Sequence, residues 1–391
     1  MNVRWRLAVA GFVCVWLTGF VWAVRPSAQA RGGGAGQIAT TAGNKKAGEA
    51  FKNVTTSTLK ELSVDDFIGS MGVISAALGF DCADCHPGAG SDEVDWVVDT
   101  QLKKTARRMV EMVATINRTQ FGGAQKVTCW TCHHGKLDPA TSIQLDVLYE
   151  TPNSEVDDIV KVEDGQPTAD QIFDKYIQAR GGAQRLAGLT SIVATGNSLG
   201  YMNLGGQGSF TLYAKSPNQR SVVINYKDHP ERGTSGWTFD GKTGYISVPR
   251  ALLGEYELVG EELDGARLEA QLLFPGQIKT ILNNWRVGAR RSIGDRDYVV
   301  VQGTGTRGYM GTLYFDPDTG LLRRLVRYGP SPVGRVIVQI DYTDYRDVNG
   351  IKFPFEYKFS WLDGRYTAKL TDVKMNVPID ASKFGKPSAM K

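Results

Sequence analysis

Two short cysteine motifs of the same kind are the residues of this sequence that could do chemistry. CADCH at residues 82–86 and CWTCH at residues 129–133 each place two thiols three positions apart, with a histidine directly after the second. Two such thiols can form thioethers to one edge of a porphyrin, and the histidine then lies under the iron as an axial ligand. We therefore expect two covalently bound haem c groups, with thioethers to Cys82, Cys85, Cys129 and Cys132 and iron ligation by His86 and His133.

Three other chemistries also use paired cysteines. A redox-active dithiol, a zinc site built from the two pairs, and disulfides in an exported protein all fit a C-x-x-C spacing. None of them requires a histidine directly after the second cysteine, whereas haem attachment does. The repeated histidine, in a chain that has four histidines in all, favours haem attachment. The other two, His134 and His229, are interpreted as surface residues.

A haem iron that carries electrons usually keeps a second strong ligand, and methionine sulfur raises its potential. Met71 precedes the first motif and Met109 the second, each in a stretch whose apolar residues recur with helical period. Ser63 and Gly79 are the predicted start and stop of the first helix. Spacing alone does not distinguish a core methionine from a ligand. The predicted inward faces are Phe67, Met71, Ile74 and Leu78 in the first helix, and Leu102, Ala106, Met109, Val113 and Ile116 in the second.

Residues 48 to 140 resemble the cytochrome c subunit of photosynthetic reaction centres, a tetrahaem protein in its full-length members. The matching stretches are AFKNV, SVDDFIGSMGVISAALGFDCADCH, TARRMVEMVATIN and VTCWTCHHGK, in the order and approximate spacing of that subunit's first two haem segments. In the family, each of these haems takes a methionine from the helix before its motif. The resemblance therefore implies Met71 and Met109 as the second iron ligands, with Met112 as a lesser candidate on the same helix.

The sequence departs from this family in two ways. It contains no third or fourth C-x-x-C-H motif, and it reads Thr119-Gln120-Phe121 where the family supplies a histidine to its fourth haem. The chain thus resembles half of the tetrahaem unit. The resemblance implies a role in photosynthesis, whereas a chain with half of the relay could serve another electron donor or acceptor.

The N-terminal segment has the order of a secretory signal peptide. Basic MNVRWR is followed by an apolar run from Leu7 to Val24 and by Ala28-Gln29-Ala30, which predicts that residues 1–30 are cleaved off. Cys14 would leave with them. The chain is therefore predicted to be exported and periplasmic. If it is not cleaved, an apolar run of this length would anchor the chain to the membrane.

The second half of the sequence has the pattern of a mostly antiparallel sheet. A helix over 169–180, ending at Gly181-Gly182, precedes short alternating segments rich in β-branched and aromatic residues. Turn residues at 316–320 and 348–350 predict two tight reversals between strands. The predicted strands are SFTLYAK, RSVVINY, WTFDG, GYISV, YVVVQG, GTLYFD, RRLVRY, RVIVQIDY, FEYKFSW and AKLTDV.

This half also resembles, by pattern and more weakly, the open curved sheets of bacterial lipoprotein carriers of the LolA type. That resemblance implies a concave apolar face that could hold a lipid or a segment of a partner protein. A module that docks and positions the haem domain is the alternative.

Together these features predict a multidomain α + β chain. A flexible linker (31–46) precedes a mostly helical dihaem c-type cytochrome domain (47–149). A polar linker (150–168) then leads to a mostly antiparallel β-sheet domain with an N-terminal helix, LolA-like in pattern (169–391).

The predicted function is the transfer of single electrons by a carrier rather than an enzyme, with other redox proteins of the periplasm or membrane as partners. Two alternatives remain open: a dihaem enzyme such as a peroxidase, in which one iron keeps an open position, and a protein that acts through a ligand on the β domain.

The net charge of +4 is small for 391 residues and no block of Lys and Arg occurs, which argues against nucleic acid as a partner. A basic cluster beside Met109 is interpreted as a solvated helix face, with pairing to haem propionates or to an acidic redox partner as the alternative. It comprises Lys103, Lys104, Arg107 and Arg108.

Overall fold

A computed structural model describes residues 45–89, 94–142, 159–200, 207–226, 233–248 and 254–387. The predicted signal peptide, most of the first predicted linker and His229 lie outside the described residues. No helix in the described part of the chain is both long and apolar enough to span a membrane.

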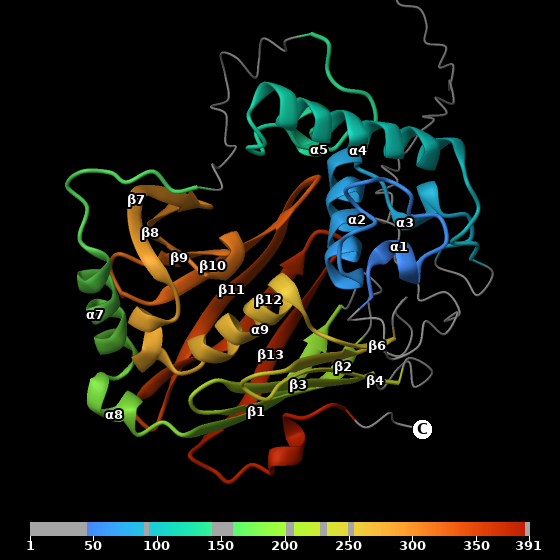
Figure 1. Cartoon of the computed structure of the whole chain (residues 1–391). Helices are drawn as coiled ribbons and strands as arrows, with labels where there is room; N and C mark the ends of the chain where they lie inside the picture. Colours follow the sequence, from blue (N-terminus) through green and yellow to red (C-terminus); the bar gives the residue numbers. More distant parts are fainter. Residues whose placement is uncertain are drawn as a thin grey trace, which may run out of the picture.

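The first part of the described chain is built from helices and turns. The long helix α4 lies across the end of α2, and both belong to an apolar cluster that includes Val73 of α2 and Val110 of α4 (Figure 1). The two cysteine motifs occupy short helices of their own. The bounds are α1 (Ala47–Ala50), α2 (Val64–Leu78), α3 (Cys82–Cys85), α4 (Gln101–Gln120) and α5 (Cys129–His133).

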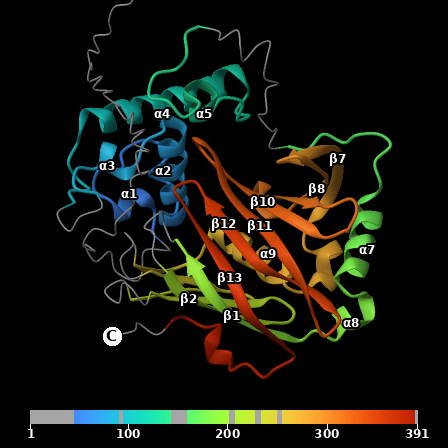
Figure 2. The same ribbon diagram turned by 180° about the vertical axis from the view of Figure 1, so that it is seen from behind.

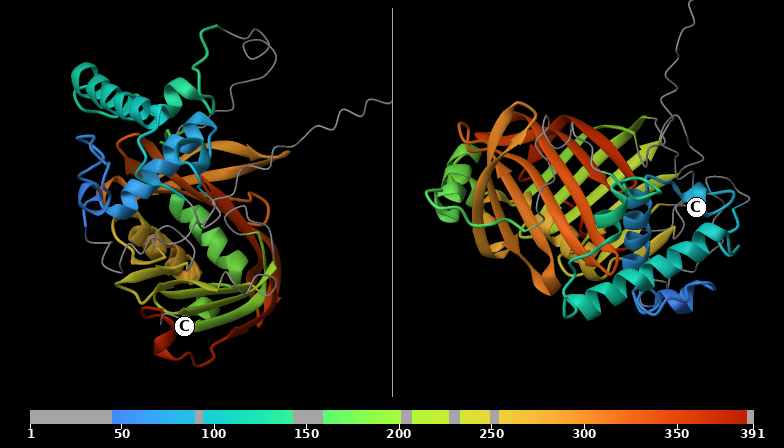
Figure 3. Two further views of the ribbon diagram at one scale, coloured as in Figure 1. Left: turned by 90° about the vertical axis from the view of Figure 1, so that its right-hand side faces the viewer. Right: turned by 90° about the horizontal axis from the view of Figure 1, so that it is seen from above.

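The rest of the described chain forms one large antiparallel sheet. Its strand order is β6-β5-β4-β3-β2-β1-β13-β12-β11-β10-β9-β8-β7. Strands consecutive in sequence therefore pair with each other, except that β6 and β7 form the two edges and β1 pairs with β13. Figures 2 and 3 show that the sheet is strongly curved. The bounds are β1 (Ser191–Leu199), β2 (Gln207–Lys215), β3 (Gln219–Tyr226), β4 (Thr234–Phe239), β5 (Gly244–Ser247), β6 (Glu255–Glu257), β7 (Asn283–Ile293), β8 (Arg296–Thr304), β9 (Met310–Phe315), β10 (Leu322–Ser331), β11 (Gly334–Val348), β12 (Ile351–Trp361) and β13 (Gly364–Met375).

Helices α7, α8 and α9 pack on one face of this sheet, within its curve (Figure 3). Phe173 of α7 and Leu268 of α9 are fully buried in the main apolar cluster. A small pocket between these helices, β11 and β12 is lined by tyrosines and by Arg180, whose guanidinium donates to Tyr176 Oη at 2.6 Å. The bounds are α7 (Ala169–Arg180), α8 (Ala183–Ala187) and α9 (Gly260–Leu272), with 3-10 turns at η3 (Pro275–Thr280), η4 (Thr306–Gly308) and η5 (Ala381–Lys383).

Several local predictions are confirmed. Helix α2 begins after Ser63, whose hydroxyl accepts the Asp66 N–H, and it ends at Gly79 with φ +66°. Helix α7 ends at Gly181, and the reversals at 316–320 and 348–350 join β9 to β10 and β11 to β12. The large antiparallel sheet is confirmed, while the existence of a separate cytochrome domain stays a prediction.

Other elements were not predicted. Strands β1, β6 and β7 and helix α9 have no counterpart among the predicted segments. Within the second predicted linker, Val160 is buried, and its N–H donates to Gln302 Oε1 of β8 at 3.0 Å. This contact brings the linker onto the sheet before α7 begins.

The N-terminal ends of α2 and α9 meet, and acidic side chains gather there. A Cβ at Gly260 of α9 would lie 3.1 Å from Asp66 Oδ1 of α2. Arg327 of β10 binds the Glu262 carboxylate with two hydrogen bonds of 3.0 and 3.3 Å. Burial, together with the charges of Asp66 and Glu262, raises the pKa of Glu261 to about 8. Burial also raises the pKa of Asp65 well above its usual range.

We expect Glu261 to make the protein less stable as the pH rises from its ordinary pKa of 4.5 to its folded pKa of about 8. In this range the folded state keeps a proton that the unfolded chain releases, so rising pH favours unfolding. Glu261→Gln should remove much of this decline and stabilise the protein near pH 8 by on the order of 1–3 kcal/mol. Urea denaturation at acidic and alkaline pH measures the effect, with the exposed Glu163→Gln as control. Equal pH slopes for wild type and Glu261→Gln would contradict the prediction.

Candidate haem-attachment site

The first motif forms one helical turn with its own cap. Asp81 Oδ1 accepts the Ala83 N–H at 2.7 Å, and the Asp84 carboxylate accepts the Asp81 N–H at 2.8 Å. These reciprocal bonds satisfy backbone donors that a helix start leaves free. Residues three apart on a helix share one side, so the turn presents Cys82 and Cys85 together.

The second motif is capped in the same way by neutral side chains. Thr128 Oγ1 accepts the Thr131 N–H at 3.3 Å, and Thr131 Oγ1 accepts the Thr128 N–H at 3.0 Å. Helix α5 ends at His134, which has φ +47°. The left-handed conformation at His134 ends the helix. His133, which directly follows Cys132, is therefore the last helical residue.

The two histidines of the motifs are set up differently. His133 Nδ1 lies 3.0 Å from the Lys136 carbonyl oxygen, which places the proton on Nδ1 and leaves Nε2 as the free donor of a lone pair. The His86 ring packs 5.0 Å from Trp96, and its buried Nδ1 has no hydrogen-bond partner among the described residues. Burial and the charge of Lys103 lower the pKa of His86 to about 4. The His86 ring is therefore neutral at physiological pH, as a metal ligand must be, and the hydrogen bond of His133 Nδ1 orients the second ring.

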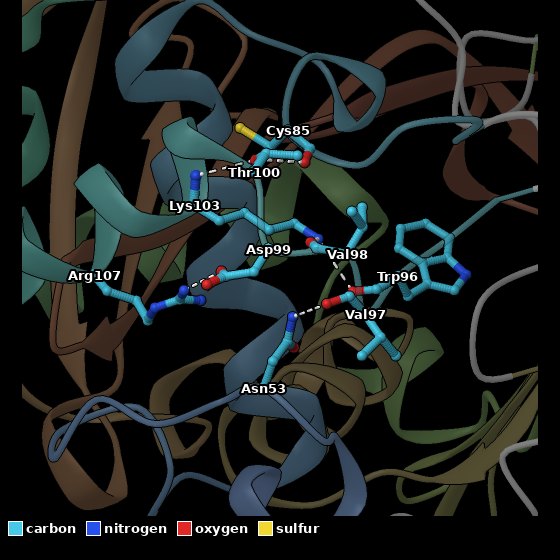
Figure 4. A network of polar contacts seen from close by, with 9 residues as sticks. All are labelled: Asn53, Cys85, Trp96, Val97, Val98, Asp99, Thr100, Lys103 and Arg107. Atoms are coloured by element: carbon cyan, nitrogen blue, oxygen red, sulfur yellow. Dashed lines mark hydrogen bonds and ion pairs between the residues drawn. The ribbon is translucent and has the colours of Figure 1, made fainter.

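A polar network holds the segment between the first motif and α4 (Figure 4). Lys103 Nζ donates to the carbonyl oxygens of Trp96 and Val98 at 3.1 and 2.9 Å, and Thr100 Oγ1 donates to the Cys85 carbonyl oxygen at 3.3 Å. Arg107 pairs with Asp99, and Asn53 Nδ2 donates to the Val97 carbonyl oxygen at 2.9 Å. The prediction of a solvated basic face is therefore wrong for the buried Lys103, whereas Lys104 and Arg108 are exposed.

The thiols do not have the properties of a redox-active pair. Burial raises the pKa of Cys82 and of Cys129 to about 11, whereas reactive dithiols need a lowered pKa. The four thiols are not joined by disulfides. Among the described residues, which include all four cysteines, no three His, Cys, Asp or Glu side chains converge closely enough to hold a metal ion. The two pairs therefore do not make one four-cysteine zinc site.

The predicted inward faces of α2 and α4 are not their most buried sides. In α2 the buried side comprises Val64, Asp65, Ser70, Val73 and Ala77, and in α4 it comprises Lys103, Val110, Val113 and Asn117. Met71 and Met109 are half-buried on the adjoining faces, and Met112 is 43% exposed. Met71 packs in the same cluster as Cys129. The reason is that the smaller residues of α2 pack against the sheet domain, which turns its larger apolar residues toward the surface.

Apolar side chains are unusually exposed in residues 94–142. A haem is a large apolar ring that would cover such a surface when bound, so the exposure fits covalent haem at the two motifs. The capped cysteine pairs, the neutral His86 and the oriented ring of His133 fit the same group. The exposed large apolar residues of this part are Val97, Val98, Met112, Phe121, Trp130 and Leu137.

Asn117 is a site residue that sequence reasoning missed. It is 7% exposed, and its Oδ1 accepts the N–H groups of Lys126 and Val127 at 3.0 and 2.9 Å. Its Nδ2 donates to the Val127 carbonyl oxygen at 2.7 Å. One side chain thus holds the segment that enters the second motif. An asparagine within an apolar helical stretch was the signal that could have found it.

Residues 28–172 match the family model of the photosynthetic reaction centre cytochrome C subunit. This part of the chain is similar to that family. The match extends beyond both ends of the stretch that the motifs indicated, and it confirms the resemblance to a cytochrome c-like subunit, for which haem c is implied. No curated protein matches the chain significantly.

The β-sheet part resembles solved structures of the LolA superfamily, as its pattern predicted. The LolA superfamily protein NE2245 from Nitrosomonas europaea is 16% identical with a TM-score of 0.39, and the match covers 56% of this chain and 99% of that one. A DUF1329 family protein from Desulfovibrio piger is 12% identical with a TM-score of 0.36, and the match covers 56% of this chain and 98% of that one.

Asn117→Ala should destabilise the protein by about 1–3 kcal/mol, because it leaves the partly buried backbone groups of Lys126 and Val127 without their side-chain partner. It should also speed amide exchange in the segment that leads to Cys129. Urea denaturation and hydrogen exchange measure the two effects. Thr119→Ala, two positions away and exposed, is the control. If Asn117→Ala costs no more stability than this control, the amide does not hold the segment.

Proposed function

We propose that the chain is a dihaem c-type cytochrome that passes single electrons between other redox proteins. The observation that carries the proposal is the double occurrence of a capped C-x-x-C-H turn beside half-covered apolar surface. Both turns lie in the part of the chain that is similar to the reaction-centre cytochrome subunit. Raised thiol pKa values and the lack of a shared metal cluster among the described residues weigh against the other uses of paired cysteines.

Each residue of the site has one role in this proposal. Cys82 and Cys85 hold one haem by thioethers, and Cys129 and Cys132 hold the other. His86 and His133 would each offer an imidazole nitrogen to the iron, and the Nδ1 hydrogen bond of His133 fixes the orientation of its ring. Haem iron, when bound, supplies reversible one-electron chemistry without bond making.

Met71 and Met109 are the proposed second iron ligands, with Met112 as the lesser candidate. Both lie half-buried on helix faces that also carry other apolar residues, which supports a role beside an apolar group. Met71 and Met109 would hold the iron from the helices before the motifs and so keep water from it. With both positions filled, the chain acts as a carrier rather than as an enzyme.

The proposed location is the periplasm, after export by the signal peptide of residues 1–30. Partners would be redox proteins of the periplasm or membrane. A photosynthetic reaction centre is one such partner, which the family match supports. The proposed units are the dihaem domain at 47–149 and the sheet domain at 169–391.

The first test is the haem content of protein matured with a c-type haem attachment system. Pyridine haemochrome analysis should give two haems per chain, and the spectrum should be low-spin in both redox states. Cys129→Ala/Cys132→Ala and Cys82→Ala/Cys85→Ala should each leave one haem, because each motif acts alone. A high-spin component in the wild type would favour an enzyme with an open iron, and a wild type without covalent haem would end the proposal.

Substitution of the methionines tests the second ligands. Met71→Ala and Met109→Ala should each convert one haem of the oxidised protein to a high-spin form and lower its reduction potential, because thioether sulfur favours reduced iron. Optical and paramagnetic resonance spectra measure this change. Met112→Ala, from the exposed side of α4, should leave both haems low-spin. The opposite result, with Met112 required and Met109 dispensable, would reassign the ligand.

A further inference from the structure

The turn between β10 and β11 contacts the second attachment motif directly. The Cys129 N–H donates to the Val333 carbonyl oxygen at 3.0 Å, and Gln125 Nε2 donates to the Ser331 carbonyl oxygen at 2.6 Å. Val333 is fully buried and lies in the same apolar cluster as Cys129. The turn therefore meets the backbone that carries the first cysteine of CWTCH.

The same turn also contacts helix α2. Ser70 Oγ lies 3.2 Å from Ser331 Oγ, and both serines are buried. A Cβ at Gly334 would lie 2.8 Å from Val73 Cγ1, which leaves no room for a larger residue. One turn of the sheet domain thus touches both the helix that carries Met71 and the motif that carries Cys129, as the ends of β10 and β11 near α2 and α5 show (Figures 1 and 2).

A second hairpin turn contacts the helix that leads into the first attachment motif. Leu362, in the turn between β12 and β13, packs in the apolar cluster of α2, and a Cβ at Gly72 of this helix would lie 3.4 Å from it. Helix α2 ends four residues before Cys82 of CADCH. One turn of the sheet domain therefore contacts the second motif directly, and the other contacts the helix before the first motif.

The motifs depend on such outside contacts because they are short. Helix α3 has 4 residues and α5 has 5, whereas helices below about 12–15 residues are marginal by themselves. The strands behind the two turns have 10, 15, 11 and 12 residues and are hydrogen-bonded side by side. Because the paired strands are rigid, the spacing of the two turns is fixed by the sheet.

We propose that the turns Ser331–Gly334 and Leu362–Asp363 form a hairpin clamp, which holds the second motif and the helix α2 that leads into the first motif, and so sets where the two haem-attachment motifs lie relative to each other. This inference rests on the proposed function, within which the sheet domain would position the haem-attachment motifs. Val333 and Gly334 are positioning residues, which act through Cys129 and α2. A haem's potential follows its burial and surroundings, so displacing the clamp changes the potential of the second haem.

Gly334→Ala tests the clamp in the full-length mature protein. The new methyl group meets Val73 and should push the turn away from α2 and Cys129. We expect exchange of the Cys129 amide to quicken about tenfold or more. We also expect one of the two reduction potentials to shift, with two haems per chain retained. Gly294→Ala is the matched control, because it also has positive φ in a hairpin turn but would place its Cβ more than 4 Å from any other residue.

Rescue distinguishes positioning from a general loss of stability. Adding Val73→Ala removes both γ-methyl groups of Val73, including the Cγ1 with which the new Cβ of Gly334→Ala would clash. The double variant should therefore have the exchange rate and potentials of Val73→Ala alone. If Gly334→Ala fails to fold, the exposed Gln125→Ala should give a smaller change of the same kind by removing one bond to the turn. Wild-type exchange and potentials in whichever variant folds would overturn the clamp, whereas failure of the proposed function would show in the haem count of the wild type.

Discussion

The arrangement of the two motifs depends on one constraint: strand β11 and the residues after the second motif both pack closely against helix α2. Small residues on one side of this helix allow it: a Cβ at Gly69 would lie 3.1 Å from Val336 Cγ2 of β11. At the end of the helix, a Cβ at Gly79 would lie 2.3 Å from the carbonyl oxygen of Gly135, just after the second motif. The Gly135 N–H in turn donates to the Ala77 carbonyl oxygen at 2.8 Å. Larger residues here would separate the second motif from the helix that precedes the first.

This packing explains why the methionines lie where they do. A helix that buries its small side against a sheet must turn its larger apolar residues elsewhere. In α2 these include Phe67, Met71 and Ile74, which stay partly covered at the edge of the cluster. These residues lie on the same side of α2 as the proposed ligand Met71, so the proposed haem would add to their cover.

Much of the local structure follows from short stretches of sequence. Ser63 and Gly79 bound α2 because a hydroxyl can cap a helix start and glycine tolerates the left-handed conformation at its end. Alternation over four to eight residues marks most strands of the sheet. Strand β7 was not predicted because the arginines in its sequence NNWRVGARRSI interrupt the apolar alternation. Helix α9 was not predicted because Glu261, Glu262 and Asp264 interrupt its apolar periodicity. In both, the burial that stabilises the element comes from distant residues.

The sequence by itself determined the chemistry proposed for the site, because that proposal follows from the spacing of thiols and histidine within five residues. It also determined which helices precede the motifs. Only the tertiary structure decided which sides of those helices are covered, that Lys103 is buried, and that a hairpin turn meets the second motif. These facts depend on contacts such as Ser70 with Ser331, which lie 261 residues apart in the sequence. Periodicity reports a helix's own faces, but it carries no information about which distant surface will cover them.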